Sequence, residues 1–184
     1  MEPEIDDDLA LFGLCEGLVH PIVGIDHLLA MASVGIVSAI LGRGAIWIMP
    51  AAFVMAMAAG GIAGLNAVEL PRTETLIAIS LVTLGLGIAA AQVVSASGKS
   101  LPVWLFALAV VFFGVAHGNA HGLEVPRAAS PTMFAVGFLV STSALHIAGV
   151  GLGLLSSKRP WLATGVSIAG CFTAALGVGL LARE

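Results

Sequence analysis

The chain has 184 residues, of which 59% are hydrophobic and 10% are charged, and its formal net charge at pH 7 is -4. Soluble domains carry about one quarter charged residues, so this composition, with a mean hydropathy of +1.07, excludes an ordinary water-soluble domain. The negative charge also argues against a nucleic-acid partner. We therefore predict an all-α integral membrane protein.

Six apolar stretches are long enough to cross the hydrocarbon core of a bilayer, which takes about 20 residues. The first stretch is too long for one straight crossing. It contains Pro21 and Gly24, which favour a kink or a break in a helix. We therefore expect a compact bundle of about six transmembrane helices. The predicted spans are Leu9 to Leu41, Ala45 to Val68, Thr75 to Ser95, Leu101 to His121, Met133 to Leu155 and Trp161 to Ala182.

The ends of the predicted spans differ in charge. Residues 1–8 form an acidic N-terminal tail before a single transmembrane domain at 9–184, and the tail lacks the positive flank of a secretory signal. Most acids lie at the ends of the spans that share a side with this tail, together with Arg72, Arg127 and Arg183. Since Lys and Arg accumulate on the cytoplasmic side, both termini are predicted to lie outside, in a bacterial inner membrane. The basic residues of the predicted cytoplasmic loops are Arg43, Lys99, Lys158 and Arg159.

The distribution of small residues bears on packing and symmetry. The chain has 23 glycines, which let membrane helices approach closely. Three spans lie on each side of the central loop, so an inverted repeat is compatible with the sequence, as in many transporters. The one similarity between the two halves is that the first span and the fourth span each contain a pair of histidines.

Ionisable side chains are costly in a membrane span and therefore mark functional sites. The first span contains His20 and His27, and on a straight helix they would lie about 10.5 Å apart along the axis, too far for one ion to touch both. A break at Pro21 and Gly24 would let them approach. Asp26 can supply an oxygen ligand or fix the tautomer of a histidine. The alternative is a buried polar pair that holds helices together.

The fourth span ends with His117 and His121, whose i, i+4 spacing places both imidazoles on one face of a helix. Glu124 lies one turn beyond His121. The alternative is a helix end whose histidines face the headgroups. In the fifth span, His146 is isolated and is either a metal ligand or a hydrogen-bond donor between helices.

This combination of imidazoles and carboxylates predicts a first-row transition-metal site, because imidazole suits Ni, Co, Zn, Fe and Cu, whereas Mg and Ca prefer oxygen ligands. The metal ion is expected as the substrate. The candidate ligands are His20, Asp26, His27, His117, His121 and His146, and the candidate gate or auxiliary residues are Glu16, Glu74 and Glu124.

The motif H-P-x-x-G-x-D-H-x-x-x-M-x-x-V-G, from His20 to Gly35, resembles the first-span signature of the HupE/UreJ family of nickel or cobalt permeases. H-G-x-x-H-G-x-E, from His117 to Glu124, and L-H-x-x-G at 145–149 are also similar to family motifs, as is Leu70-Pro71 followed by Glu74. The resemblance implies six helices, passage of nickel or cobalt across the membrane, and an indirect supply of metal to a nickel or cobalt enzyme such as hydrogenase or urease.

Two features depart from the family pattern. Glu16, one turn before His20, stands where a small residue is expected, and it is an extra ligand, a gate carboxylate or a protonated buried acid. The run Asp6-Asp7-Asp8 stands in place of the histidine-rich N-terminus of some members. This run either attracts cations or is a solvated tail.

We therefore favour a permease over an enzyme. It is expected to bind the ion at intramembrane His and Asp residues and to work in the lipid bilayer alone or as a homo-oligomer. The chain has no G-x-x-x-x-G-K-[ST] loop for ATP, so energy would come from a gradient, the membrane potential or a separate subunit. The main alternative is an intramembrane zinc hydrolase, in which three histidines hold zinc and an acid activates water. A metal sensor or a structural membrane subunit is a third reading. Polar residues at several depths, from Glu16 to His27, favour the permease.

Overall fold

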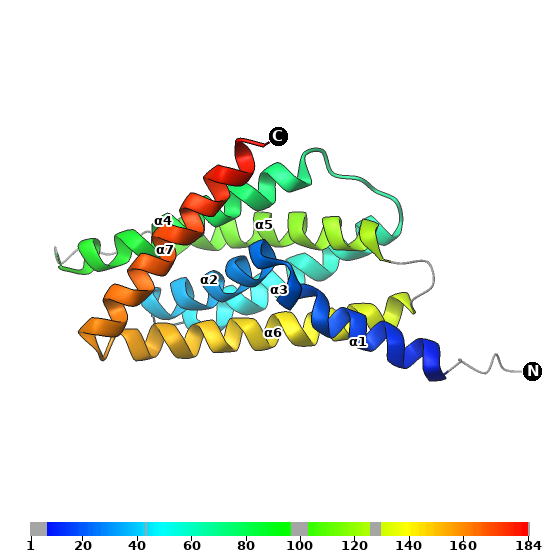
Figure 1. Ribbon diagram of the computed structural model, residues 1–184, viewed down its shortest axis with the longest axis horizontal. Helices are drawn as coiled ribbons and strands as arrows, with labels where there is room; N and C mark the ends of the chain where they lie inside the picture. The colour runs from blue at the N-terminus through cyan, green and yellow to red at the C-terminus, as the bar shows by residue number, and fades with distance from the viewer. Residues whose placement is uncertain (1–6, 43, 97–102, 126–129, 184) are drawn as a thin grey trace, which may run out of the picture.

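The computed structural model describes residues 7–42, 44–96, 103–125 and 130–183. Within these ranges the chain forms seven α-helices and no β-strand (Figure 1). The all-α fold predicted from composition is therefore confirmed. The helices are α1 (Asp7–Val23), α2 (Ile25–Leu41), α3 (Ala45–Leu65), α4 (Thr73–Ala96), α5 (Val103–Glu124), α6 (Pro131–Ser156) and α7 (Pro160–Leu181).

Five of these helices, α3 to α7, are each long and apolar enough to cross a membrane. The helices α1 and α2 reach that length only together, and their axes are bent by 79° at the break between them. The pair forms a broken span or a re-entrant segment. The described part of the chain therefore has five to six candidate spans, in agreement with the predicted bundle of about six.

The break in the first span falls at Gly24, whose ψ of 103° lies outside the helical region. Pro21 lies in the last turn of α1 and has no N–H to donate to the preceding turn, which weakens the helix just before the break. The Gly24 N–H donates to the His20 carbonyl at 3.3 Å, and the Leu28 N–H donates to the Gly24 carbonyl at 2.8 Å. A single non-helical residue therefore separates the helices that carry His20 and His27.

The other helix ends lie close to the predicted ones, and local structure explains the differences. The α3 helix ends at Leu65 and not at Val68, because Ala67 adopts a φ of 58°, which a helix cannot continue through. The α6 helix begins with Pro131 after Ser130, whose side chain accepts a hydrogen bond from the Met133 N–H. Of the predicted acidic tail, residues 1–6 lie outside the described residues, and Asp7 and Asp8 form the first turn of α1.

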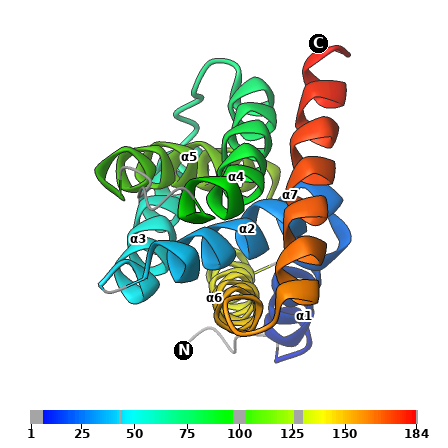
Figure 2. The same ribbon diagram turned by 90° about the vertical axis from the view of Figure 1, so that its left-hand side faces the viewer.

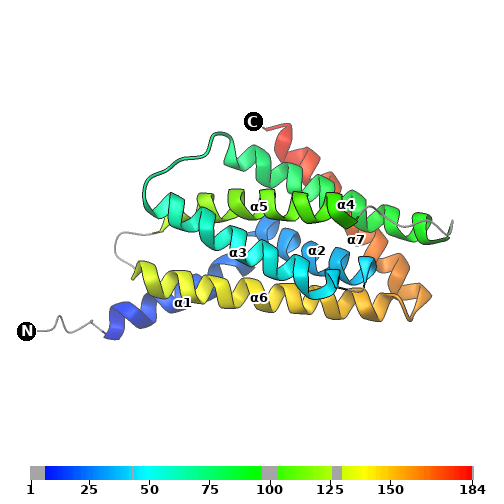
Figure 3. The ribbon, with the colours of Figure 1, turned by 180° about the vertical axis from the view of Figure 1, so that it is seen from behind.

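Closely packed helix pairs build the bundle. The α3 helix packs on α5, α4 packs on α7, and α6 packs on both α1 and α2. Figure 3 shows α3 beside α5 from behind, and Figure 2 shows α4 and α7 side by side. A Cβ atom on Gly118 of α5 would overlap the Met57 carbonyl of α3, and one on Gly17 of α1 would overlap the Phe134 carbonyl of α6. Glycine therefore permits the close contacts that the composition predicted.

The two ends of the bundle carry different charges. In Figure 1, the start of α1, the end of α3 and the end of α5 lie toward one end, and the turn between α6 and α7 lies at the other. The second end contains Lys158 and Arg159, whereas the predicted basic loop residues Arg43 and Lys99 lie outside the described residues. The first end carries the acids Asp7, Asp8, Glu69, Glu74 and Glu124 and also the basic residue Arg72 of the α3–α4 loop.

Candidate metal site

Four of the five histidines converge where α1 and α2 face α5. The His121 ring lies 4.8 Å from the His20 ring and 4.3 Å from the His27 ring, measured between centroids. The His117 ring lies 5.3 Å from the His27 ring. We call His20, His27, His117 and His121 the four-histidine cluster. The break at Gly24 therefore brings both histidines of the first span to the same side chain of α5.

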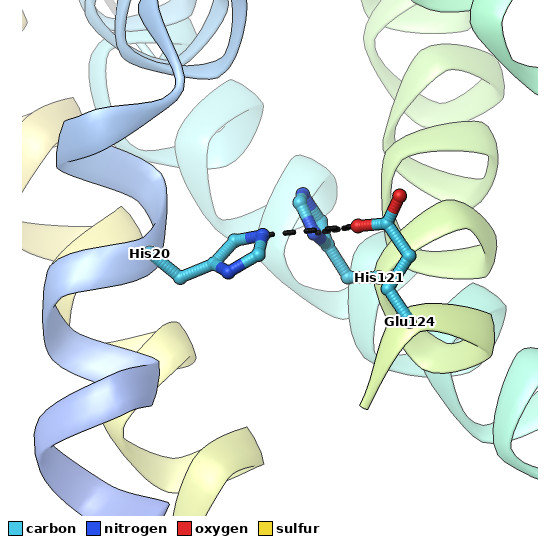
Figure 4. Close-up of side chains that lie close together, drawn as sticks. All are labelled: His20, His121 and Glu124. Atoms are coloured by element: carbon cyan, nitrogen blue, oxygen red, sulfur yellow. Dashed lines mark ion pairs between the residues drawn. The ribbon is translucent and has the colours of Figure 1, made fainter. Parts of the chain in front are cut away.

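Three side chains of this region approach the geometry of a metal site. Nε2 of His20 and Nδ1 of His121 each lie 3.8 Å from Oε2 of Glu124. One ligand atom from each of the three lies within 4.8 Å of the others. Figure 4 shows His20 on α1 facing His121 and Glu124 on α5. Metal–ligand bonds of about 2.1 Å place neighbouring ligands about 3 to 3.5 Å apart, so shortening the longest separation by about 1.3 to 1.8 Å would let the three bind one ion.

The deeper histidines of the cluster are oriented by hydrogen bonds to one ring nitrogen. Nδ1 of His27 lies 3.1 Å from Oδ1 of Asp26, and Nδ1 of His117 lies 2.9 Å from the Phe113 carbonyl oxygen. Because these partners accept, the Nδ1–H groups donate, and Nε2 is left without a hydrogen in each neutral ring. A carboxylate or carbonyl on one nitrogen fixes the tautomer and makes the other nitrogen a better metal ligand.

Several buried ring nitrogens of the cluster have no hydrogen-bond partner. Nε2 of His27, Nε2 of His117 and both ring nitrogens of His121 are buried without a hydrogen-bond partner in the described part of the chain. Buried polar side-chain atoms usually have a partner, so each exception calls for an explanation. A metal ion bound by these nitrogens accounts for several exceptions at once, and the donor set fits a transition-metal ion.

Exposure decreases from one side of the cluster to the other. The side chains of Glu124 and His20 are 57% and 37% exposed, whereas those of His27 and His121 are 13% and 5% exposed. His117 is fully buried. A cavity of about 670 Å³, which we call the His20 cavity, is lined by His20 and Glu124 among other residues. Glu124 and His20 therefore lie on the exposed side of the cluster, and His117 lies on its buried side.

The two remaining auxiliary candidates occupy different places. Glu16 lines the His20 cavity, and its Oε2 atom is buried without a hydrogen-bond partner among the described residues. Glu74 lies at the start of α4 and lines a separate cavity formed by residues 69–75. Proximity therefore groups Glu16 with the cluster, while the functional roles of both acids stay predictions.

His146 lies outside the four-histidine cluster. It is buried in α6, and its ring makes an edge contact with Phe53 of α3 at a centroid distance of 5.2 Å. The same Phe53 ring contacts His117 at 5.5 Å. The six predicted ligands therefore do not form one contiguous set, because the Phe53 ring lies between His146 and His117.

Two residues that shape the site were missed from the sequence. Asn119 lies between the two histidines of α5, donates its amide to the Val68 carbonyl at 2.7 Å and accepts from the Leu70 N–H at 2.9 Å. It thereby holds the α3–α4 loop against α5. The sequence did offer a sign of this residue, because a polar amide within the H-x-x-x-H motif is unusual in an apolar span. Phe53 gave no signal, because an apolar side chain in an apolar span looks like any other.

The fold and the cluster define a polytopic helical membrane protein with a histidine-rich site among its helices. A sequence model of the family described as HupE / UreJ protein matches residues 5–180. The chain therefore belongs to the HupE/UreJ family, a nickel and cobalt transport family, as the motifs predicted. It is 40% identical over 143 residues to Protein HupE of Rhizobium leguminosarum bv. viciae, a match that covers 78% of this chain and 71% of that protein. No solved structure gives a significant match.

Proposed function

We propose that this chain is a permease that carries Ni²⁺ or Co²⁺ across a bacterial inner membrane and binds the ion at the four-histidine cluster with Asp26 and Glu124. The observation that carries the proposal is the set of buried, unpaired ring nitrogens of His27, His117 and His121 behind the exposed Glu124. Imidazole suits both metals, and membership of a nickel and cobalt transport family supports the choice over Zn, Fe and Cu.

The distances suggest an order of binding. The ion exchanges water for Glu124, His20 and His121 in the His20 cavity, which Glu16 also lines. It then moves to the unpaired Nε2 atoms of His27 and His117 by exchange of ligands. His121 takes part at both positions, because its ring contacts both His20 and His27. Successive weak positions allow release as well as capture, which transport requires.

The charge distribution supports one orientation for this route. The His20 cavity and both termini face the outside, and the end with Lys158 and Arg159 faces the cytoplasm. The imported metal would supply a nickel or cobalt enzyme in the cytoplasm. No chemistry on the metal is needed for this function, because the ion is the cargo.

Elemental analysis of cells tests the proposal. Cells expressing the wild type, His27→Ala or Ile25→Ala at equal membrane abundance are exposed to a low-micromolar mixture of Ni, Co, Zn, Fe and Mn. Ile25 is 54% exposed at the start of α2 and serves as the matched control. We expect selective accumulation of Ni or Co in the wild type and the control, and loss in His27→Ala. Equal metal contents in all strains, with metal still bound to the purified wild type, would instead indicate a sensor or an enzyme.

A further inference from the structure

His146 is a buried imidazole that the proposed route does not use. It is 1% exposed, and both its ring nitrogens are buried without a well-formed hydrogen bond among the described residues. The sequence left open that this histidine joins two helices as a hydrogen-bond donor, but neither nitrogen makes such a bond here. The ring lies near the backbone carbonyl of Thr142 in the same helix, which can satisfy one nitrogen at most. At least one ring nitrogen is therefore buried without a partner among the described residues, which is unusual for a buried polar group.

A second unpaired polar atom lies on the same face of α6. The Thr142 hydroxyl is fully buried and has no hydrogen-bond partner among the described residues. Thr142 precedes His146 by four residues, so both side chains project from one face of the helix. His146 and Ser143 also line a cavity of about 370 Å³ between α6 and α3, to which Pro50 and Val54 of α3 contribute. The Thr142 hydroxyl and the His146 imidazole therefore share one face of α6, and the imidazole also borders free space.

His146 lies farther along the bundle than the four-histidine cluster. Phe138 of α6 contacts both His20 and His121. His146 follows Phe138 by eight residues on the same helix, which corresponds to about 12 Å along the helix axis. It therefore lies beyond the cluster, toward the end of the bundle that carries the turn between α6 and α7.

Phe53 occupies the space between His117 and His146. It is fully buried, and its ring makes edge contacts with both imidazoles, at 5.5 Å and 5.2 Å between centroids. The α3 helix that carries Phe53 packs mainly on α5, and the 370 Å³ cavity lies along its boundary with α6. The ring therefore separates the two histidines and would have to move for an ion to pass directly from one to the other.

We propose that His146 is a second binding position for the divalent transition-metal ion, and that the Phe53 ring is the gate that separates it from the four-histidine cluster. This inference rests on the proposed function. The ion leaves Nε2 of His117, binds a ring nitrogen of His146 with the Thr142 hydroxyl close by, and Phe53 changes rotamer to allow the transfer. A position with one imidazole and one hydroxyl holds the ion weakly, which favours release.

Two substitutions separate a ligand from a packing residue. His146→Phe keeps an aromatic ring against Phe53 and removes both nitrogen donors, whereas His146→Cys loses volume and restores a metal donor. Both are made with Cys15→Ser and Cys171→Ser, since the two native cysteines are exposed. We expect His146→Phe to lower Ni²⁺ or Co²⁺ uptake at least tenfold and His146→Cys to stay within about threefold of the parent. Parental uptake by His146→Phe, or equal loss in both variants, would overturn the inference.

A binding measurement keeps the test decisive if His146→Phe does not fold. Purified His146→Cys protein is titrated with Co²⁺ alone, and thiolate-to-cobalt charge-transfer absorption reports binding at the introduced thiol. We expect this band in His146→Cys and not in Val140→Cys, a control at a 55% exposed position of α6. Adding Phe53→Trp, with its larger ring, should slow the appearance of the band at least tenfold.

The outcomes distinguish this inference from the proposed function. If the wild type binds cobalt, His27→Ala loses it, and the introduced thiol never shows the band, the second position does not exist and the permease proposal stands. If Phe53→Trp leaves the rate unchanged, Phe53 is not the gate. If His27→Ala leaves both cobalt binding and accumulation unchanged, the proposed function itself is wrong.

Discussion

At the scale of single residues, Asp26 fixes which ring nitrogen of His27 is available to a metal ion. The carboxylate accepts from Nδ1 of His27 at 3.1 Å and leaves Nε2 buried and unpaired. Asp26→Asn removes the negative charge while keeping an oxygen acceptor. We expect cobalt affinity to fall about 10- to 100-fold, as for other partners of metal-binding histidines. A Co²⁺ titration of purified protein measures this, with Asp8→Asn, in the exposed first turn of α1, as the control.

Asn119 affects stability more than chemistry. Asn119→Leu leaves the Val68 carbonyl and the Leu70 N–H without their side-chain partner, so we expect the free energy of unfolding to fall by about 2 to 4 kcal/mol. Thermal unfolding in detergent measures the change. Asn66→Leu is the control, because Asn66 is exposed and its amide donates only within α3, to the Ile62 carbonyl at 2.7 Å. Equal melting temperatures for the two variants would contradict a special role of Asn119.

What the sequence could predict at this scale depends on how local each contact is. The proximity of Asp26 to His27 and the shared face of His117 and His121 follow from adjacency and helical spacing. The approach of Glu124 to His20 does not, because it joins residues of α1 and α5 that only the packed bundle brings together. Phe53 has no local signature at all, since its part in the site rests on contacts with α5 and α6.

At the scale of helices, the contact of α3 with α5 depends on missing side chains. A Cβ atom on Gly118 would collide with the backbone of Met57 and Gly61, which cannot move away as a flexible side chain would. Gly118→Ala should therefore cost at least about 1 to 3 kcal/mol of folding free energy. Gly165→Ala in α7 is the control, because an added Cβ atom there meets nothing within 4 Å. The melting temperature and the membrane abundance should fall in Gly118→Ala and not in Gly165→Ala. An equal fall in both variants would contradict the packing argument.

Helix positions were predictable because apolar runs long enough to span a bilayer leave few alternatives. The break in the first span was also predictable, since Pro21 and Gly24 weaken a helix wherever it lies. The bend of 79° was not, because its size depends on how α1 and α2 each pack on α6. The position of the α3–α4 loop could not be predicted either, because Asn119 of α5 holds it through hydrogen bonds to Val68 and Leu70.

At the scale of the whole molecule, the helix pairing has a pattern relevant to the inverted repeat with which the sequence is compatible. The first span pairs with the fifth, the second with the fourth, and the third with the sixth. Exchanging the two halves of the chain turns the first pairing into the second and leaves the third unchanged. This pattern agrees with an inverted repeat, which stays a prediction. No sequence period indicated it, because pairing between distant spans depends on which small-residue faces meet.

The orientation of the whole bundle follows from charge at its ends and can be tested directly. Single cysteines are introduced as Glu69→Cys in the α3–α4 loop or Ser157→Cys beside Lys158, in a background of Cys15→Ser and Cys171→Ser. Both positions are exposed. Because basic residues stay in the cytoplasm, a membrane-impermeant maleimide should label the Glu69→Cys protein in intact spheroplasts and the Ser157→Cys protein only after lysis. The reverse pattern would place the His20 cavity on the cytoplasmic side, and the same histidines would then serve export.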